Sequence, residues 1–186
     1  MSESALAERR RRGADRWDEV WEGVLHVVPA PSYWHQELGT RLLLAIAPLA
    51  QARGLVITYE TNVLGPAGTT DYRVPDIVVA REERRARLGV EGGPELVVEI
   101  LSPDDESRQK LPFYARIGTR EVLLVDPDTR AVELLRLRGE KLVRVEPDAE
   151  GALLSEVLGA SFATVAGPHL RVAWEGGASG PGAVEL

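Results

Sequence analysis

The chain has 186 residues, of which 44% are hydrophobic and 27% charged, and this composition excludes a disordered or fibrous protein. Its 22 Lys and Arg residues stand against 29 Asp and Glu residues, and the net charge of −7 excludes a broadly basic surface for nucleic acid. Cysteine is absent, which excludes disulfides, thiolate metal sites and a cysteine nucleophile. We expect one domain that buries roughly 70% of its unfolded surface.

The longest apolar run, residues 42–50, is interrupted by Pro48 and falls short of the about 20 residues that span a bilayer. The first residues are polar, include the block Arg9–Arg12, and do not resemble a secretory signal. We therefore expect a cytoplasmic protein. Its expected divisions are a mobile arm at 1–14, a single domain at 15–175 and a flexible Gly/Ser/Pro tail at 176–186.

The first half of the chain contains strand and helix patterns. Loose alternation of apolar residues around Glu22-Gly23 predicts a β-hairpin between Trp17 and Val28. Apolar residues at helical spacing predict a helix from about 33 to 53 that stops at Gly54 and kinks or ends early at Pro48. Three strands should follow, at residues 55–64, 74–80 and 95–101.

The second half repeats the order of helix and strands. Pro112 is tolerated only in the first turn of a helix and Gly118 closes one, so a helix at 109–117 should begin close to Lys110. Strands are predicted at residues 121–126, 131–137 and 141–145, with Glu121 on the surface. Helix, sheet, helix and sheet in one chain are typical of an α/β or α+β fold.

Two carboxylates accompany strands that are otherwise apolar. Glu99 lies near the end of a segment so apolar that both of its faces must be covered, so its charge needs a cation, hydrogen bonds or a metal. The alternative is a glutamate that faces solvent or an arginine at the strand mouth. Asp76 opens a second apolar strand after Pro75, where a turn residue would explain it equally well.

Lys110 is the candidate partner for these carboxylates. Side chains alternate along a strand, so Glu99 shares its face with residue 101, which is leucine and brings no cation. Lys110 begins the next predicted helix and is one of two lysines in a chain with 20 arginines, which hints at a need for a compact ammonium. We expect its Nζ within about 4 to 6 Å of the Asp76 or Glu99 carboxylate.

Three stretches are specific when taken together: 72–79 (YRVPDIVV), 97–103 (VVEILSP), and 110–118 (KLPFYARIG) leading to 121–127 (EVLLVDP). With them, the chain from about Trp17 to Leu137 resembles the Uma-two (Uma2) family of putative restriction endonucleases, within the PD-(D/E)XK nuclease superfamily. The resemblance implies a restriction-endonuclease-like α/β (α+β) core, a central mixed sheet flanked by helices, here with an N-terminal hairpin.

The resemblance also implies site residues. Asp76 and Glu99 match the two metal-binding acids, and Lys110 matches a lysine moved from the strand to the next helix. The two acids and the Ile100 carbonyl would hold Mg²⁺ or Mn²⁺, which lowers the pKa of a water and polarises a phosphate. Lys110 would orient or deprotonate that water, or neutralise developing charge. The expected activity is metal-dependent hydrolysis of DNA phosphodiester bonds, by a homodimer because cutting two strands usually takes two sites.

Other residues keep two interpretations. His35 shares the apolar stripe of the first long helix, so it is either a packed core histidine or an auxiliary site residue. Arginines that either contact phosphates or form solvated faces are Arg9 to Arg12, Arg81, Arg84, Arg85 and Arg87.

A catalytically inactive nucleic-acid-binding or interaction module on the same fold is the alternative function. The acidic net charge and the leucine at position 101 favour it. A purely structural protein is a third possibility, and the expected burial of Glu99 speaks against it.

Overall fold

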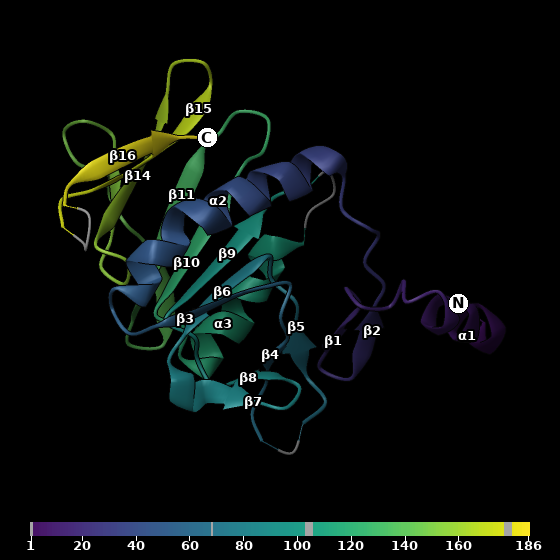
Figure 1. Ribbon diagram of the computed structural model, residues 1–186. Coiled ribbons are helices and arrows are strands. Elements are labelled where there is room, and N and C mark those ends of the chain that lie inside the picture. Colours follow the sequence, from purple (N-terminus) through teal and green to yellow (C-terminus); the bar gives the residue numbers. More distant parts are fainter. Residues whose placement is uncertain (1, 68, 103–105, 177–179) are drawn as a thin grey trace.

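A six-stranded mixed sheet forms the centre of the computed structural model, which describes residues 2–67, 69–102, 106–176 and 180–186 (Figure 1). Its strand order is β12-β11-β10-β9-β6-β3, and β9 and β10 run parallel while the other neighbours run antiparallel. The bounds are β3 Val56–Tyr59, β6 Ile77–Ala80, β9 Leu96–Ile100, β10 Glu121–Val125, β11 Val132–Arg138 and β12 Lys141–Arg144. All residues of the central strands β6, β9 and β10 are buried, which explains their continuous apolar sequences.

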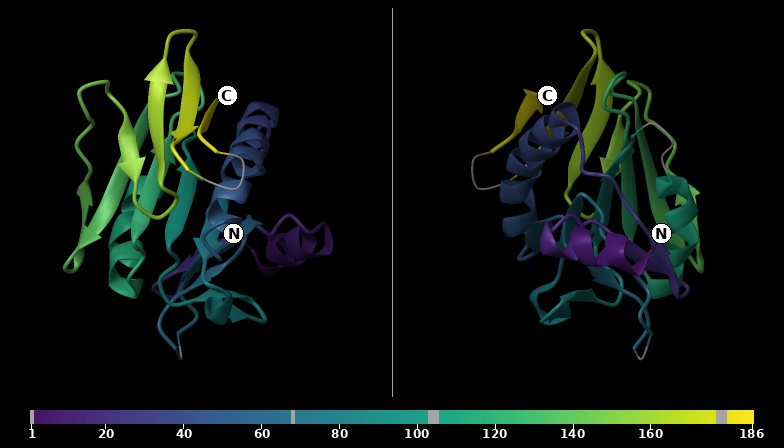
Figure 2. Two further views of the ribbon diagram at one scale, coloured as in Figure 1. Left: turned by 60° about the vertical axis from the view of Figure 1, so that its left-hand side comes forward. Right: turned by 90° about the vertical axis from the view of Figure 1, so that its right-hand side faces the viewer.

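Helices cover the two faces of this sheet. Helix α2 (Tyr33–Gln51) packs a stripe of buried residues, among them Leu38, Leu42 and Ile46, against one face. On the other face lie the 3₁₀-helix η2 (Ser107–Lys110) and helix α3 (Leu111–Ile117), which form the crossover that parallel strands require. Figure 2 shows α2 and α3 on opposite sides of the sheet. The predicted mixed sheet flanked by helices is confirmed.

The carboxyl end of α3 agrees with the sequence prediction, whereas that of α2 differs from it. Gly118 closes α3 in the left-handed conformation, with a φ of 85°. Helix α2, however, continues through Pro48 to Gln51, so of the two alternatives predicted at Pro48, a kink or an early end, the early end is wrong. Proline leaves the carbonyl four residues earlier without its helical bond, and here that residue is Leu44, on the solvent side of α2, where water can donate to it.

A second sheet carries the N-terminal hairpin. Strands β1 (Glu19–Trp21) and β2 (Val24–His26) form the predicted hairpin, and positive φ values at Glu22 and Gly23 suit its two-residue turn. The sheet order is β2-β1-β5-β4-β8-β7, with β4 Val63–Leu64, β5 Tyr72–Arg73, β7 Arg85–Ala86 and β8 Gly89–Glu91, and the 3₁₀-helix η1 (Glu82–Arg84) precedes β7.

Arg73 anchors this hairpin to α3. Its guanidinium carbon lies 4.6 Å from the ring centroid of Trp21 in β1 and 4.2 Å from that of Phe113 in α3. The same guanidinium donates to the Val20 carbonyl at 2.8 Å and to Asp71 at 2.7 Å. The hairpin is therefore held against the same helix that follows Lys110.

The two chain termini differ from the sequence prediction. Residues Glu3–Arg11, expected in a mobile arm, form helix α1, and Arg9 pairs with Asp18 at 2.5 Å. The expectation of a flexible tail is wrong for residues 182–186, while residues 177–179 lie outside the described part. Gly182–Glu185 form β16, and Leu186 is buried. Val184 and Leu186 are two residues apart, so their side chains point to the same side of the strand, where both pack against the core.

Strand β16 belongs to a third sheet that no sequence pattern above predicted. Its order is β13-β14-β15-β16, with β13 Leu153–Ser155, β14 Ala160–Val165 and β15 His169–Trp174. Phe162, Leu170 and Val172 of this sheet join the core that α2 covers. None of the helices in the described segments is long and apolar enough to cross a bilayer.

Glu121 is buried, which corrects the expectation of a surface residue. Its carboxylate accepts from Arg136 Nε at 2.8 Å, from Ser155 Oγ at 2.5 Å and from the Glu156 backbone N–H at 3.0 Å. The contacts join β10, β11 and the third sheet. The sequence around Glu121 could not predict this burial, because its partners lie 15 to 35 residues further along the chain.

We expect Glu121→Ala to lower the free energy of unfolding by about 3 to 5 kcal/mol, because it leaves buried donors without their acceptor. Urea unfolding followed by circular dichroism measures the change. Glu140→Ala, at an exposed turn, is the control and should stay within about 0.5 kcal/mol of the parent protein. An equally small effect at Glu121 would contradict the structural role.

Candidate active site

Glu99 is the centre of a buried polar cluster at the carboxyl end of β9. The side chain is almost fully buried, on the face that it shares with Val97 and that α3 covers. Tyr114 of α3 donates its hydroxyl to Glu99 Oε1 at 2.6 Å. Lys110 Nζ lies 3.2 Å from the same oxygen and 3.3 Å from Oε2. The expected proximity of Lys110 and Glu99 is therefore found, and the alternative of a solvent-facing Glu99 is wrong.

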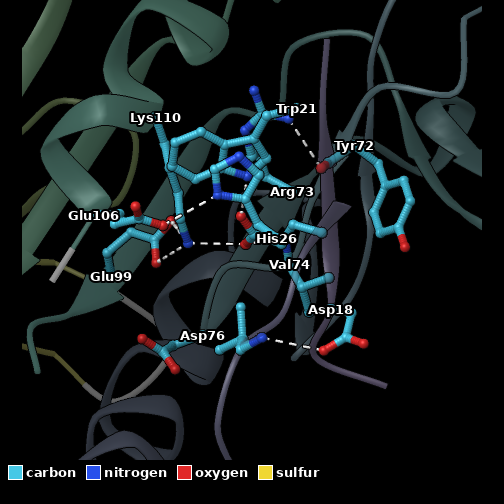
Figure 3. A network of polar contacts seen from close by, with 12 residues as sticks. Asp18, Trp21, His26, Tyr72, Arg73, Val74, Asp76, Glu99, Glu106 and Lys110 are labelled. Carbon is cyan, nitrogen blue, oxygen red and sulfur yellow. Dashed lines mark hydrogen bonds and ion pairs between the residues drawn. The ribbon is translucent and has the colours of Figure 1, made fainter. Parts of the chain in front are cut away.

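Lys110 also contacts a second carboxylate. Its Nζ lies 2.9 Å from Oε1 of Glu19, a residue of β1 that is only 1% exposed. Figure 3 shows Lys110 extended toward Glu99 from the helical side, with the strands of the hairpin on the other. The ammonium is thus shared between carboxylates from β1 and β9.

Asp76 stands at the start of β6, beside the end of β9. Ile77 pairs with Val98 in this antiparallel ladder, so the register continued by one residue puts Asp76 across from Glu99. Asp76 Oδ2 accepts the Ile100 backbone N–H at 2.7 Å. This hydrogen bond to the neighbouring strand fixes the Asp76 carboxylate at the end of β9, and a role as a turn residue does not explain it.

His35 joins Asp76 from α2. Its Nε2 lies 3.0 Å from the Ile100 carbonyl oxygen and 3.5 Å from Asp76 Oδ1. Ser32 caps the helix and accepts the His35 backbone N–H, which fixes the first turn of α2 above the strand end. His35 therefore lies beside two predicted site residues, and its hydrogen bond suits a packed core histidine as well as an auxiliary site residue.

The charges in this cluster change one another's protonation. Burial raises the pKa of Glu99 to about 8, and repulsion from Asp76 and Glu19 adds to the effect, while Lys110 and the Tyr114 hydrogen bond oppose it. Burial by itself would lower the pKa of Lys110, but the carboxylates of Glu99 and Glu19 raise it above its ordinary value. Lys110 is therefore an ammonium at neutral pH, held between the carboxyl groups of Glu19 and Glu99.

The donor atoms suit a hard divalent cation. Among the described residues, no three His, Cys, Asp or Glu side chains are grouped so that they could hold a metal by themselves. The carbonyl oxygen of Ile100 and Oδ1 of Asp76 nevertheless both lie close to His35 Nε2, at 3.0 and 3.5 Å, so two oxygen donors stand at the same strand end. Carboxylate and carbonyl oxygens are the ligands that Mg²⁺ and Mn²⁺ favour, so the residues present fit such an ion.

Five of the eight arginines predicted as phosphate contacts have carboxylate partners. Arg81 bonds to Glu95 at 2.8 Å, Arg85 pairs with Glu82, and Arg11 and Arg12 both pair with Glu8. Arg9 contacts Asp18. These pairs reduce the local positive charge on which phosphate binding depends.

Glu19 is the member of the cluster that sequence reasoning missed. It lies two residues before Trp21, on the same side of β1. A carboxylate that shares a strand face with a tryptophan indicates burial, and Trp21 Nε1 does donate to Glu19 Oε2 at 2.6 Å. This alternation is the signal that could have identified it.

Comparison with known proteins identifies the family and supports the fold. The profile of the Uma2 family, described as "Putative restriction endonuclease", matches residues 7–166. A crystal structure of a putative nuclease belonging to DUF820 from Anabaena variabilis is similar, with a TM-score of 0.57 and 24% identity, over 71% of this chain and 78% of that one. At that identity the likeness shows the fold. No curated protein matches the chain.

We expect Glu99→Gln to gain stability relative to the parent, in the metal-free protein, as the pH rises from 5 to 8, by at most about 1.4 kcal/mol for each pH unit. Native Glu99 binds a proton up to about pH 8, whereas the unfolded side chain releases it near 4.5, so the parent protein loses stability across this range. Glutamine cannot titrate and escapes the loss. Urea unfolding in EDTA at several pH values measures the difference.

Glu95→Gln is the control for this experiment. Glu95 directly precedes β9, but bonds from Arg81 and Arg120 hold the pKa of Glu95 below its ordinary value despite its burial. Its substitution should therefore destabilise and show no gain that increases with pH. A Glu99→Gln protein that gains no stability relative to the parent as the pH rises would identify a structural ion pair instead.

Proposed function

Because the chain belongs to the Uma2 family, described as "Putative restriction endonuclease", we propose that it is a Mg²⁺- or Mn²⁺-dependent endonuclease that hydrolyses DNA phosphodiester bonds. Family membership supports a nuclease function. The metal dependence, the DNA substrate and the roles of individual residues are the proposal.

Asp76, Glu99 and the Ile100 carbonyl would hold the cation. When bound, it would lower the pKa of a water and stabilise the added negative charge on phosphorus. Asp76 is suited to this task because its bond to the Ile100 N–H orients it toward the strand end. His35 would fix the Ile100 carbonyl from the opposite side, as an auxiliary residue.

Lys110 would act on the water or on the phosphate. Its Nζ is 3.2 Å from Glu99 and its pKa is raised, so it is charged and suited to orient a water or to neutralise charge on a phosphate oxygen. Tyr114, whose pKa burial raises well above its ordinary value, stays protonated and donates to Glu99. These groups would set the position of the Glu99 carboxylate.

The observation that carries the proposal is the burial of Lys110 against Glu99 at the edge where Asp76 also lies. Replacing a buried ion pair by apolar side chains is often neutral or stabilising, so such a pair is a poor device for stability alone. Charged groups with raised pKa values that gather at one strand end favour chemistry.

Exposed aromatic side chains beside the cluster support a nucleic-acid substrate. Tyr33 and Trp34 are 73% and 72% exposed, although each offers a large apolar surface. They directly precede His35, whose ring is 3.5 Å from Asp76. Nucleobases stack on such side chains without sequence preference, so the pair could hold bases next to the cleaved phosphate. For cleavage of both strands we propose a homodimer.

Lys110→Met should reduce turnover by about 10²-fold or more, because it removes the charge that acts on the water or phosphate. Nicking of supercoiled plasmid in Mg²⁺, Mn²⁺ and EDTA measures this, and Mn²⁺ affinity should change little. Lys141→Met changes the other lysine of the chain, exposed on β12, and should cut like the parent.

A parent protein that binds DNA but cuts it with neither metal would favour the inactive binding module. Equal cleavage by the Lys110→Met and parent proteins would remove Lys110 from the mechanism. Copurifying nucleases are excluded by Asp76→Asn, which should lose cleavage because it removes one negative charge from the proposed metal ligands.

Trp34→Ala should weaken binding of single-stranded DNA by about tenfold, since stacking of one base contributes about 1 to 3 kcal/mol. Fluorescence anisotropy at fixed salt, with Ca²⁺ in place of Mg²⁺, measures the affinity. Leu44→Ala removes a side chain that is 68% exposed on the same helix, ten residues away, and should have no effect. Equal affinities of the two variants would contradict the aromatic contact.

A further inference from the structure

Glu19 is a buried carboxylate outside the set of groups that the proposed chemistry uses. It lies on β1, in the short hairpin at the edge of the molecule, and yet only 1% of its surface is exposed. Its Oε1 accepts the Val74 backbone N–H at 2.8 Å and contacts Lys110 Nζ at 2.9 Å. Its Oε2 accepts Trp21 Nε1 at 2.6 Å.

Lys110 already has a carboxyl partner in Glu99, so the contact with Glu19 is a second one. Burying a second carboxyl group beside one ammonium costs desolvation energy. The Glu19 contact is nevertheless the shorter of the two, 2.9 Å against 3.2 Å. Glu19 therefore holds Lys110 at least as closely as Glu99 does.

The surroundings of Glu19 fix the orientation of its carboxylate. The Trp21 ring that donates to it stacks on His26, with ring centroids 4.0 Å apart, and the guanidinium carbon of Arg73 lies 4.6 Å from the centroid of the same Trp21 ring. His26 in turn contacts Glu106 at 3.2 Å, the residue next to η2 (Figure 3). The hairpin thus brings a rigid acceptor to the element that carries Lys110.

We infer that Glu19 is a positioning residue that retains the Lys110 ammonium beside the site when Glu99 turns its oxygens to the metal. This inference rests on the proposed function. Without Glu19, Lys110 would have Glu99 as its remaining carboxylate partner among the contacts described above, and the ammonium and the metal would compete for the same oxygens. Groups that orient metal ligands in this way typically change metal affinity by 10- to 100-fold when they are removed.

The test measures Mn²⁺ binding by isothermal titration calorimetry, without DNA. Glu19→Gln should bind Mn²⁺ about tenfold more weakly than the parent protein. Glu22→Gln is the matched control, because Glu22 belongs to the same hairpin, has a side chain that is 77% exposed and pairs with Arg116. It should bind like the parent.

A double variant shows whether Glu19 acts through Lys110. In the Lys110→Met background there is no ammonium to compete, so adding Glu19→Gln should leave the Mn²⁺ affinity within about twofold of Lys110→Met alone. A tenfold loss in both backgrounds would mean that Glu19 acts by its own charge or by the fold, and would overturn the inference. If Glu19→Gln does not fold, Glu19→Asp, which withdraws the carboxylate by one methylene, takes its place.

Kinetics separate positioning from substrate binding. Glu19→Gln should lower kcat by about tenfold or more at saturating Mn²⁺, with KM for DNA nearly unchanged, because Lys110 is displaced and no DNA contact is lost. A parent protein that binds no Mn²⁺ would overturn the proposed function together with this inference. A parent that binds Mn²⁺ no better than Glu19→Gln overturns the role of Glu19 alone.

Discussion

The structure around the candidate site depends on one buried ammonium group. Lys110 Nζ contacts Glu19 of β1 and Glu99 of β9, and therefore joins the N-terminal hairpin, the central sheet and the start of the helical crossover. The protein interior screens charge weakly, so each of the three side chains depends on its partners. Loss of any one of them removes a contact from at least one of the others. Burial raises the pKa of Glu99, and the neighbouring carboxylates raise that of Lys110 against the effect of burial, so stability and chemistry depend on the same contacts.

Features with a local physical signal could be predicted from the sequence. Continuous apolar strands, the Pro112 and Gly118 boundaries of α3, and the unusual choice of lysine at position 110 are each visible within a few residues. The alternation rule excluded residue 101 as a source of charge for Glu99, which left the following helix as a source of the cation. The structure brings Lys110 to Glu99 as these arguments require; the catalytic roles remain proposals.

Features that depend on distant partners could not be predicted in this way. Glu19 is 91 residues from Lys110 in the sequence, and its burial follows from where the hairpin docks. Glu121 resembles a surface residue until Arg136 and Ser155 surround it. The third sheet has short strands of mixed polarity, which give a weak pattern in the sequence. Its buried residues can be identified only from the structure, where they pack against the core that α2 covers.

The placement of the ammonium on a helix, with Leu101 on the strand, has an evolutionary consequence. Position 101 follows β9 directly, two residues after Glu99, whereas Lys110 ends the 3₁₀-helix η2 and reaches Glu99 from there. A lysine could therefore be gained at one position before it is lost at the other, so that two single substitutions relocate the charge without an intermediate that lacks it. Sequence searches that demand lysine two residues after the glutamate would miss every descendant of such an exchange.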